Sequence, residues 1–244
     1  MSAMFSNQPG GPGELGFRLG AIPIRIQPLF WLTTFVLAGP YFNLDPRPWP
    51  VVLFVMACLI SIVWHELGHA WAMKLFGARY VEIVLTGFGG YASTQARASR
   101  SWQRILIALA GPGNQLVAWG LLLTTINIDA MNSALESSGL ANLFVSQLLM
   151  INLVWPLLNL MPIFPLDGGR VAREVGTSLL GSKGLKISLY LSITICSTMI
   201  IWIFWAGGSM FNALLFGMLL AQNIQELQAL NDFHRFDDPG SWRS

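Results

Sequence analysis

Apolar residues are gathered along the chain in six long runs. These runs cover roughly residues 27–44, 50–73, 105–128, 140–166, 187–205 and 208–227. A helix needs about 20 residues to cross the hydrocarbon core of a bilayer, and most of the runs have about that length. Only residues 206–209, Ala-Gly-Gly-Ser, divide the last two runs. We interpret them as the turn of a helical hairpin, because one unbroken helix would be about twice the required length. The pattern predicts an all-α polytopic membrane protein with about six transmembrane helices.

The segment between the second and third runs has a different pattern. Residues 79–95, RYVEIVLTGFGGYASTQ, combine β-branched and aromatic residues with a glycine-rich centre. This combination predicts a short β-hairpin at 80–93 rather than a helix. Strand edges are tolerated at membrane depth only against protein or a wet cavity, so a membrane-associated hairpin should lie beside one.

Composition and charge support a membrane protein. Of the 244 residues, 54% are hydrophobic and 11% are charged, and the mean hydropathy is +0.56. This is far more apolar surface than one soluble core of this size could bury. We expect a multi-pass protein of a prokaryotic cell membrane, embedded in the lipid bilayer. The net charge is +2, and the sequence has no cluster of basic residues alternating with aromatic ones. No nucleic-acid partner is therefore expected.

The basic residues predict the orientation of the chain. They lie before the first run, between the second and third, between the fourth and fifth, and after the sixth, and only Arg47 falls on the opposite side. By the positive-inside rule both termini are cytoplasmic. We expect three parts: a mobile N-terminal segment at 1–15, a membrane domain at 16–230, and a short polar tail at 231–244. The N-terminus does not have the pattern of a cleaved signal peptide.

Two histidines and a glutamate interrupt the second apolar run. His65 and His69 are four residues apart, so on a helix they project from one face, and Glu66 flanks them. This is the spacing of zinc hydrolases. A single histidine on an apolar face is more often a hydrogen-bonded packing residue. However, ionisable groups at membrane depth cost about 2.5–3.5 kcal/mol each on insertion scales and usually mark function. The pattern therefore predicts a metal site.

A catalytic zinc ion needs a third protein ligand besides two histidines. Asp167 is the remaining candidate, because the other ionisable residues are interpreted as surface groups or as part of the hairpin: Glu82, Glu174, Glu226 and His234. It closes the stretch NLMPIFPLDGG, residues 159–169. Asp-Gly-Gly alone is an ordinary turn signal. Three prolines (Pro156, Pro162 and Pro165) should break the helix here, so that an unwound segment delivers the carboxylate to a polar cavity.

Four motifs occur in order across successive apolar runs: WHELGHAWAMKLFGARY, GFGGYAS, ALAGPGN and NLMPIFPLDGG. Together with the opening IPIRIQPLFWL they resemble the site-2 protease family of intramembrane zinc metalloproteases, over roughly residues 16–175. The resemblance implies one Zn²⁺ per chain bound by His65, His69 and Asp167. It also implies that Glu66 is the catalytic acid/base and that Asn159 assists near the reacting carbonyl.

The resemblance implies regulated cleavage of single-span membrane proteins or remnant signal peptides, within or near their membrane segments. Gln27 and Gln115 depart from the residues that the family often has at these positions, and Asn114 lies next to the second of them. The chain has no room for the PDZ or CBS domains of many members, so we expect a minimal form. Two alternatives stay open: an inactive adaptor that binds membrane helices, and a metal or proton transporter. The sequence does not indicate the oligomeric state.

Overall fold

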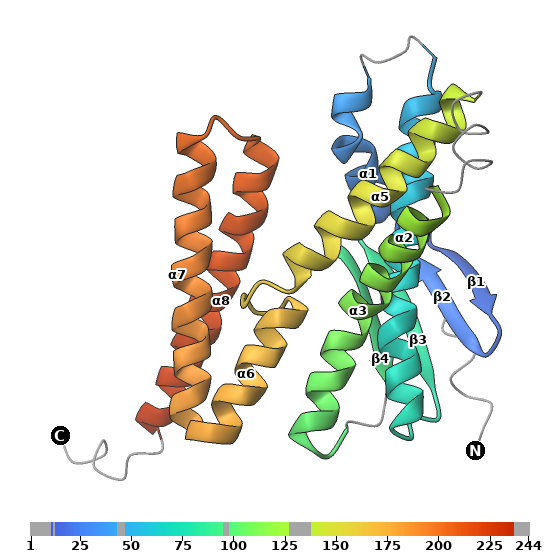
Figure 1. The fold of residues 1–244 in the computed structure, drawn as a ribbon. Coiled ribbons are helices and arrows are strands. Elements are labelled where there is room, and N and C mark those ends of the chain that lie inside the picture. Colours follow the sequence, from blue (N-terminus) through green and yellow to red (C-terminus); the bar gives the residue numbers. More distant parts are fainter. Residues whose placement is uncertain (1–10, 12, 43–46, 95–97, 127–137, 237–244) are drawn as a thin grey trace. The chain divides into compact units, whose positions relative to one another are not determined.

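Figure 1 shows the fold in a computed structural model, which describes residues 11, 13–42, 47–94, 98–126 and 138–236. The chain clusters into two compact units. The first consists of Met1–Ser99 and Ala110–Leu157, and the second of Arg100–Leu109 and Leu158–Ser244. The N-terminal segment predicted at 1–15 lies almost entirely outside the described residues, so that prediction stays untested.

A four-stranded sheet is the first feature of the first unit. Strands β1 (Leu15–Leu19), β2 (Ile22–Ile26), β3 (Val81–Thr86) and β4 (Gly89–Thr94) lie in that order (Figure 1). The β3–β4 pair is antiparallel, which confirms the predicted hairpin, while β2 pairs with β3 in parallel. Strands β1 and β2 were not predicted. The prediction of an all-α protein with a single hairpin is therefore corrected to a mostly helical fold with a four-stranded sheet. The signal for β2 was the alternation in IPIRI, where Ile22, Ile24 and Ile26 are buried.

The sheet packs against helices α1 (Pro28–Leu37) and α2 (Trp49–Leu75), with the short 3-10 helix η1 (Gly39–Tyr41) after α1. Buried side chains from β2, β3 and α1 form one core with the C-terminal half of α2, and include Ile24, Phe30, Ile83 and Leu67. Burial of each such side chain contributes about 1.5–3 kcal/mol. The sheet and α2 are therefore one packed body, which fixes the hairpin beside the helix that carries the histidines.

Two long helices contain a proline without ending there. Helix α3 (Ser101–Ile126) contains Pro112, and α5 (Gly139–Asn159) contains Pro156. The prediction that Pro156 breaks the helix is therefore wrong. Pro162 and Pro165 do lie in a non-helical segment, residues 160–166, as expected. A proline inside a helix removes one hydrogen bond, and a long apolar helix tolerates this where its neighbours support it.

The second unit contains α6 (Asp167–Leu180), α7 (Ser182–Trp205) and α8 (Met210–Phe236). Helices α7 and α8 lie side by side as a hairpin, which confirms the turn predicted at 206–209 (Figure 1). Gly207 in that turn has φ of +66°, a conformation that glycine adopts without steric cost. Helix α6 was not predicted, because its polar sequence falls outside the apolar runs. Helix α8 continues to Phe236, and residues 237–244 of the predicted tail lie outside the described part.

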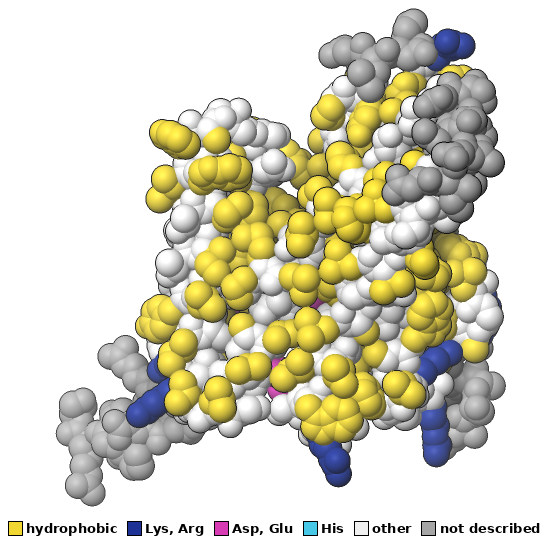
Figure 2. All heavy atoms as spheres, in the orientation of Figure 1, with side chains coloured by type: hydrophobic (Ala, Val, Ile, Leu, Met, Phe, Trp, Pro, Cys, Tyr) yellow, Lys and Arg dark blue, Asp and Glu magenta, His cyan; other side chains and the backbone are white. Residues whose placement is uncertain are grey.

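Four helices among the described residues are long and apolar enough to span a membrane: α2, α3, α5 and α7. Helix α1 is apolar but has only 10 residues, about 15 Å, and α8 is not among the four. The prediction of an integral membrane protein is therefore confirmed. The prediction of exactly six spans is not confirmed. Figure 2 shows hydrophobic side chains spread along the helices of the visible face, with few charged groups between them. Large apolar side chains such as Ile201, Trp205 and Leu121 are exposed on these helices, as expected for contact with lipid.

Candidate metal centre

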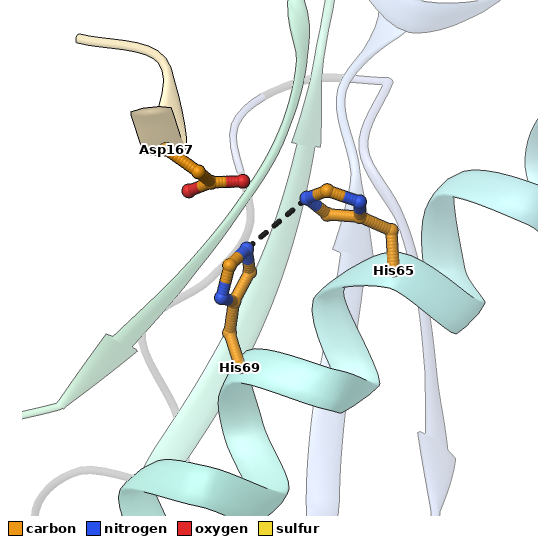
Figure 3. A group of neighbouring side chains, drawn as sticks. All are labelled: His65, His69 and Asp167. Atoms are coloured by element: carbon orange, nitrogen blue, oxygen red, sulfur yellow. Dashed lines mark hydrogen bonds between the residues drawn. The ribbon is translucent and has the colours of Figure 1, made fainter. Parts of the chain in front are cut away.

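His65 and His69 lie on one face of α2, as the spacing predicted. Both are buried, and their Nε2 atoms are 3.1 Å apart (Figure 3). The ring centroids are 4.8 Å apart and the ring planes are inclined by 75°. The two imidazoles therefore present the same nitrogen toward one point, which is the arrangement that two ligands of one ion require.

Gly111 of α3 leaves the space beside these two nitrogens open. A Cβ atom at this position would collide with Nε2 and Cε1 of His69 and would lie 2.8 Å from Nε2 of His65. Gly68 on α2 has a related role, because a Cβ there would collide with the carbonyl of Ala110. Small residues let helices approach closely in a membrane. The glycines therefore combine tight α2–α3 packing with free space at the imidazole nitrogens.

Gln115 of α3 is the hydrogen-bond partner of the first histidine. It is fully buried, and its Oε1 lies 2.8 Å from His65 Nδ1. Its Nε2 donates to the carbonyl of Ser61 at 3.1 Å, and Asn152 of α5 donates to the hydroxyl of the same serine at 2.9 Å. The sequence showed Gln115 only as a departure from a family pattern. Its signal was an amide within an apolar helix, where a buried polar group needs a partner.

Glu66 is buried next to His65 and lies against the sheet. A Cβ at Gly90 would lie 2.7 Å from Cγ and 2.9 Å from Oε1 of this glutamate. Gly90 belongs to β4, which is the last strand of the sheet in the described residues. The backbone of an edge strand therefore passes directly beside the carboxylate.

Asp167 is the first residue of α6, where its side chain is buried. It thus follows the non-helical segment 160–166 rather than belonging to it, which corrects the prediction of an unwound position. The two following glycines explain the motif: a Cβ at Gly168 would collide with the backbone of Leu160, and one at Gly169 with the backbone of Ile163. The first turn of α6 therefore packs directly on the segment before it. Arg170 lies 3.9 Å from Asp167 Oδ1, a contact too long for a strong ion pair.

Polar side chains of α7 and α8 hold the segment that leads to Asp167. The backbone N–H of Phe164 donates to Ser192 Oγ at 3.0 Å, and Asn223 Nδ2 donates to the carbonyl of Phe164 at 2.6 Å. Both anchoring side chains are buried. The sequence reasoning missed them, because they lie 25 and 56 residues from Asp167 and become its neighbours only through packing.

The other candidate ligands have different roles in the structure. Three glutamates lie in ion pairs with arginines: Glu82 with Arg25 at 3.3 Å, Glu174 with Arg104 at 2.7 Å, and Glu226 with Arg173 at 3.1 Å. The side chain of His234 lies outside the described part. Asn159 is the last residue of α5 and is half-buried. Among the described residues, one group of three could hold a metal ion: His65, His69 and Asp167, with one ligand atom of each within 4.8 Å of the others (Figure 3).

Comparison with known proteins gives a consistent result. Residues 53–136, which contain the histidine pair, match the family model Peptidase family M50. The chain is 34% identical over 186 residues to a putative zinc metalloprotease of Synechocystis sp., covering 72% of this chain and 47% of the relative. It is 31% identical over 173 residues to a zinc metalloprotease of Methanocaldococcus jannaschii, covering 70% of this chain and 48% of that relative.

The fold also matches a solved structure, the site-2 protease from Methanocaldococcus jannaschii. The TM-score is 0.62 at 23% identity, over 88% of this chain and 95% of that one. The chain spans about half the length of the curated relatives it matches. In sequence this chain is similar to peptidase family M50 and to zinc metalloproteases, and in fold it is similar to a site-2 protease.

Proposed function

We propose that this chain is an intramembrane zinc metalloprotease that cleaves single-span membrane proteins or remnant signal peptides. The observation that carries the proposal is the buried group of His65, His69 and Asp167, with Glu66 beside the first histidine. Two relatives, which match 72% and 70% of the chain, are named putative zinc metalloprotease and zinc metalloprotease, which supports the same chemistry here.

The donor set fits a zinc ion. Two nitrogens at about 2.0–2.1 Å from one tetrahedral ion are about 3.4 Å apart, and the observed separation of 3.1 Å is close to that value. Two histidines and a carboxylate are also the ligands of several catalytic zinc sites, which keep a fourth position for water or substrate. We therefore assign one zinc ion per chain to His65, His69 and Asp167.

The residues around the zinc site have separate roles in the reaction. When bound, zinc lowers the pKa of a water molecule to about 7 and polarises a carbonyl as a Lewis acid. The carboxylate of Glu66 accepts a proton from the attacking water and returns it to the departing amine. The amide of Asn159 donates a hydrogen bond to the oxygen that develops negative charge, a role whose loss typically costs about 3–4 kcal/mol of transition-state stabilisation.

Substrate presentation follows from the position of β4. A membrane helix hides its peptide bonds behind side chains, so it must unwind before a carbonyl can react. An extended segment can bind an edge strand through main-chain hydrogen bonds, and the edge strand β4 passes beside Glu66 at Gly90. We propose that substrates carry helix-weakening residues and add a strand to β4.

For the topology we propose six crossings with both termini cytoplasmic, which puts the metal centre toward the cytoplasmic side. The proposal rests on the distribution of basic residues. Besides the four long apolar helices, it requires α8, about 40 Å long, and the region of α1 to cross as well.

The test is the zinc content of the purified protein in detergent, together with a cleavage assay on a set of single-span membrane proteins. We expect about one zinc per chain, loss of most of it in His65→Ala and Asp167→Ala, and retention in the control Glu82→Gln, whose carboxylate pairs with Arg25. Glu66→Gln should keep the zinc and lose cleavage. A protein that takes up no zinc, or a Glu66→Gln variant with substantial turnover, would refute the proposal; zinc retained without any cleavage would favour the adaptor.

A further inference from the structure

Gln115 forms a bridge to one turn of α2 at two points. Its Nε2 donates to the carbonyl of Ser61, and its Oε1 faces Nδ1 of His65, one helical turn further on. The side chain is fully buried, and so is the imidazole that it contacts. It lies on α3 one turn after Gly111, the residue that leaves space at the imidazole Nε2 atoms.

The orientation of this amide follows from its partners. A backbone carbonyl can only accept a hydrogen bond, so the NH₂ end of Gln115 must face Ser61. The oxygen end therefore faces His65, and an amide oxygen can only accept. It follows that Nδ1 of His65 carries the hydrogen of this bond. In a neutral imidazole the other nitrogen then carries the lone pair, and this is Nε2, the atom that points toward His69.

We infer that Gln115 is a positioning residue that holds His65 in the tautomer required for metal binding. The inference rests on the proposed zinc site. The contact partner of a metal-bound histidine fixes the tautomer and the ring orientation, and loss of such a partner typically lowers metal affinity by about 10–100-fold. Asn152 extends the support, because it donates to Ser61 Oγ and so connects α5 to the same turn of α2.

The decisive comparison is between two substitutions of Gln115. Methionine is apolar and of similar length, so Gln115→Met removes the acceptor. Gln115→Glu keeps an acceptor for Nδ1–H but buries a carboxylate. If Gln115 only filled space, the glutamate variant would be the more damaging one, because an unpaired buried charge is costly. If it fixes the tautomer, the methionine variant loses zinc affinity by about 10–100-fold and Gln115→Glu stays close to the wild type.

A matched control is available in Gln147 of α5. This glutamine is also buried, and its Nε2 donates to the carbonyl of Pro50 at 3.1 Å. Gln147→Met removes a buried amide that, like Gln115, donates to a backbone carbonyl of α2 but does not contact His65. We expect its zinc affinity, measured by competition with a chromophoric chelator, to match that of the wild type.

The second readout does not depend on zinc. Nitrogen NMR of metal-free protein labelled in its three histidines reports which nitrogen of each ring is protonated, and His65→Ala identifies the signals of His65. We expect Nδ1–H in the wild type and in Gln115→Glu, and a loss of that preference in Gln115→Met. Nε2–H in the wild type, equal zinc affinity in Gln115→Met and the wild type, or an equal loss in Gln147→Met would each overturn the inference. A wild type that has Nδ1–H but binds no zinc would refute the proposed function while leaving the tautomer assignment supported.

Discussion

Gly111→Ala places one methyl group in the space that the metal centre requires. The added Cβ would lie 2.8 Å from His65 Nε2 and collide with His69 Nε2, whereas ordinary contacts of this kind begin at 3.4 Å. The imidazoles must therefore retreat by at least about 0.6 Å, which is several times the roughly 0.2 Å tolerance of metal–ligand distances. A misplacement of about 1 Å can cost about 100-fold in rate, equivalent to about 2.7 kcal/mol. We expect zinc affinity and cleavage each to fall by about that factor.

Gly113→Ala is the matched control for this prediction. It lies on the same helix, on the other side of Pro112, and a Cβ there would meet nothing within 4 Å. Alanine is favoured over glycine inside a helix by about 1 kcal/mol, so this variant should be as stable as the wild type or slightly more stable. The assay is chelator competition for zinc, with thermal unfolding recorded for both variants. Normal zinc binding by a folded Gly111→Ala protein would refute the reasoning, and so would an equal loss in Gly113→Ala.

Two further predictions concern glycines at other contacts. Gly168→Ala should lower thermal stability and zinc content together, because its Cβ would collide with the backbone of Leu160, which cannot rotate away; an unchanged melting temperature would contradict this. Gly90→Val should reduce cleavage while zinc content stays normal, because the side chain would press on Glu66 at the edge of the sheet; unchanged cleavage of the same membrane proteins would count against presentation on β4.

The local patterns of the sequence were sufficient for part of this fold. The hairpin at β3–β4 and the turn between α7 and α8 were predicted, because each is set by residues close together in the chain: a glycine-rich centre between β-branched runs in one case, a Gly-Gly pair in the other. The histidine pair was found for the same reason, since the four-residue spacing alone determines that both side chains share a face.

The missed elements depend on distant partners. Strand β2 pairs in parallel with β3, where Arg25 lies opposite Val84, 59 residues further on. Five residues such as IPIRI are too short to be assigned as a strand without that partner. Helix α6 was missed because a count of apolar runs does not detect a polar, amphipathic helix. Pro156 was overinterpreted, since a proline breaks a helix only where neighbouring groups cannot satisfy the freed carbonyl.

Buried amides and hydroxyls support the candidate ligands in both units. In the first, Gln115 and Asn152 converge on Ser61, one turn before His65. In the second, both groups bind the backbone of Phe164, three residues before Asp167. Ser192 accepts a hydrogen bond from its N–H, and Asn223 donates one to its carbonyl. Charged side chains could also form these hydrogen bonds, but burying a charge at membrane depth costs more free energy than burying an amide. A neutral amide also supplies both a donor and an acceptor. Because polar residues are expensive in such helices, their positions mark where geometry is being fixed, and this reasoning identifies Asn223 as the next residue, after Gln115, whose loss should disturb a metal ligand that it does not touch.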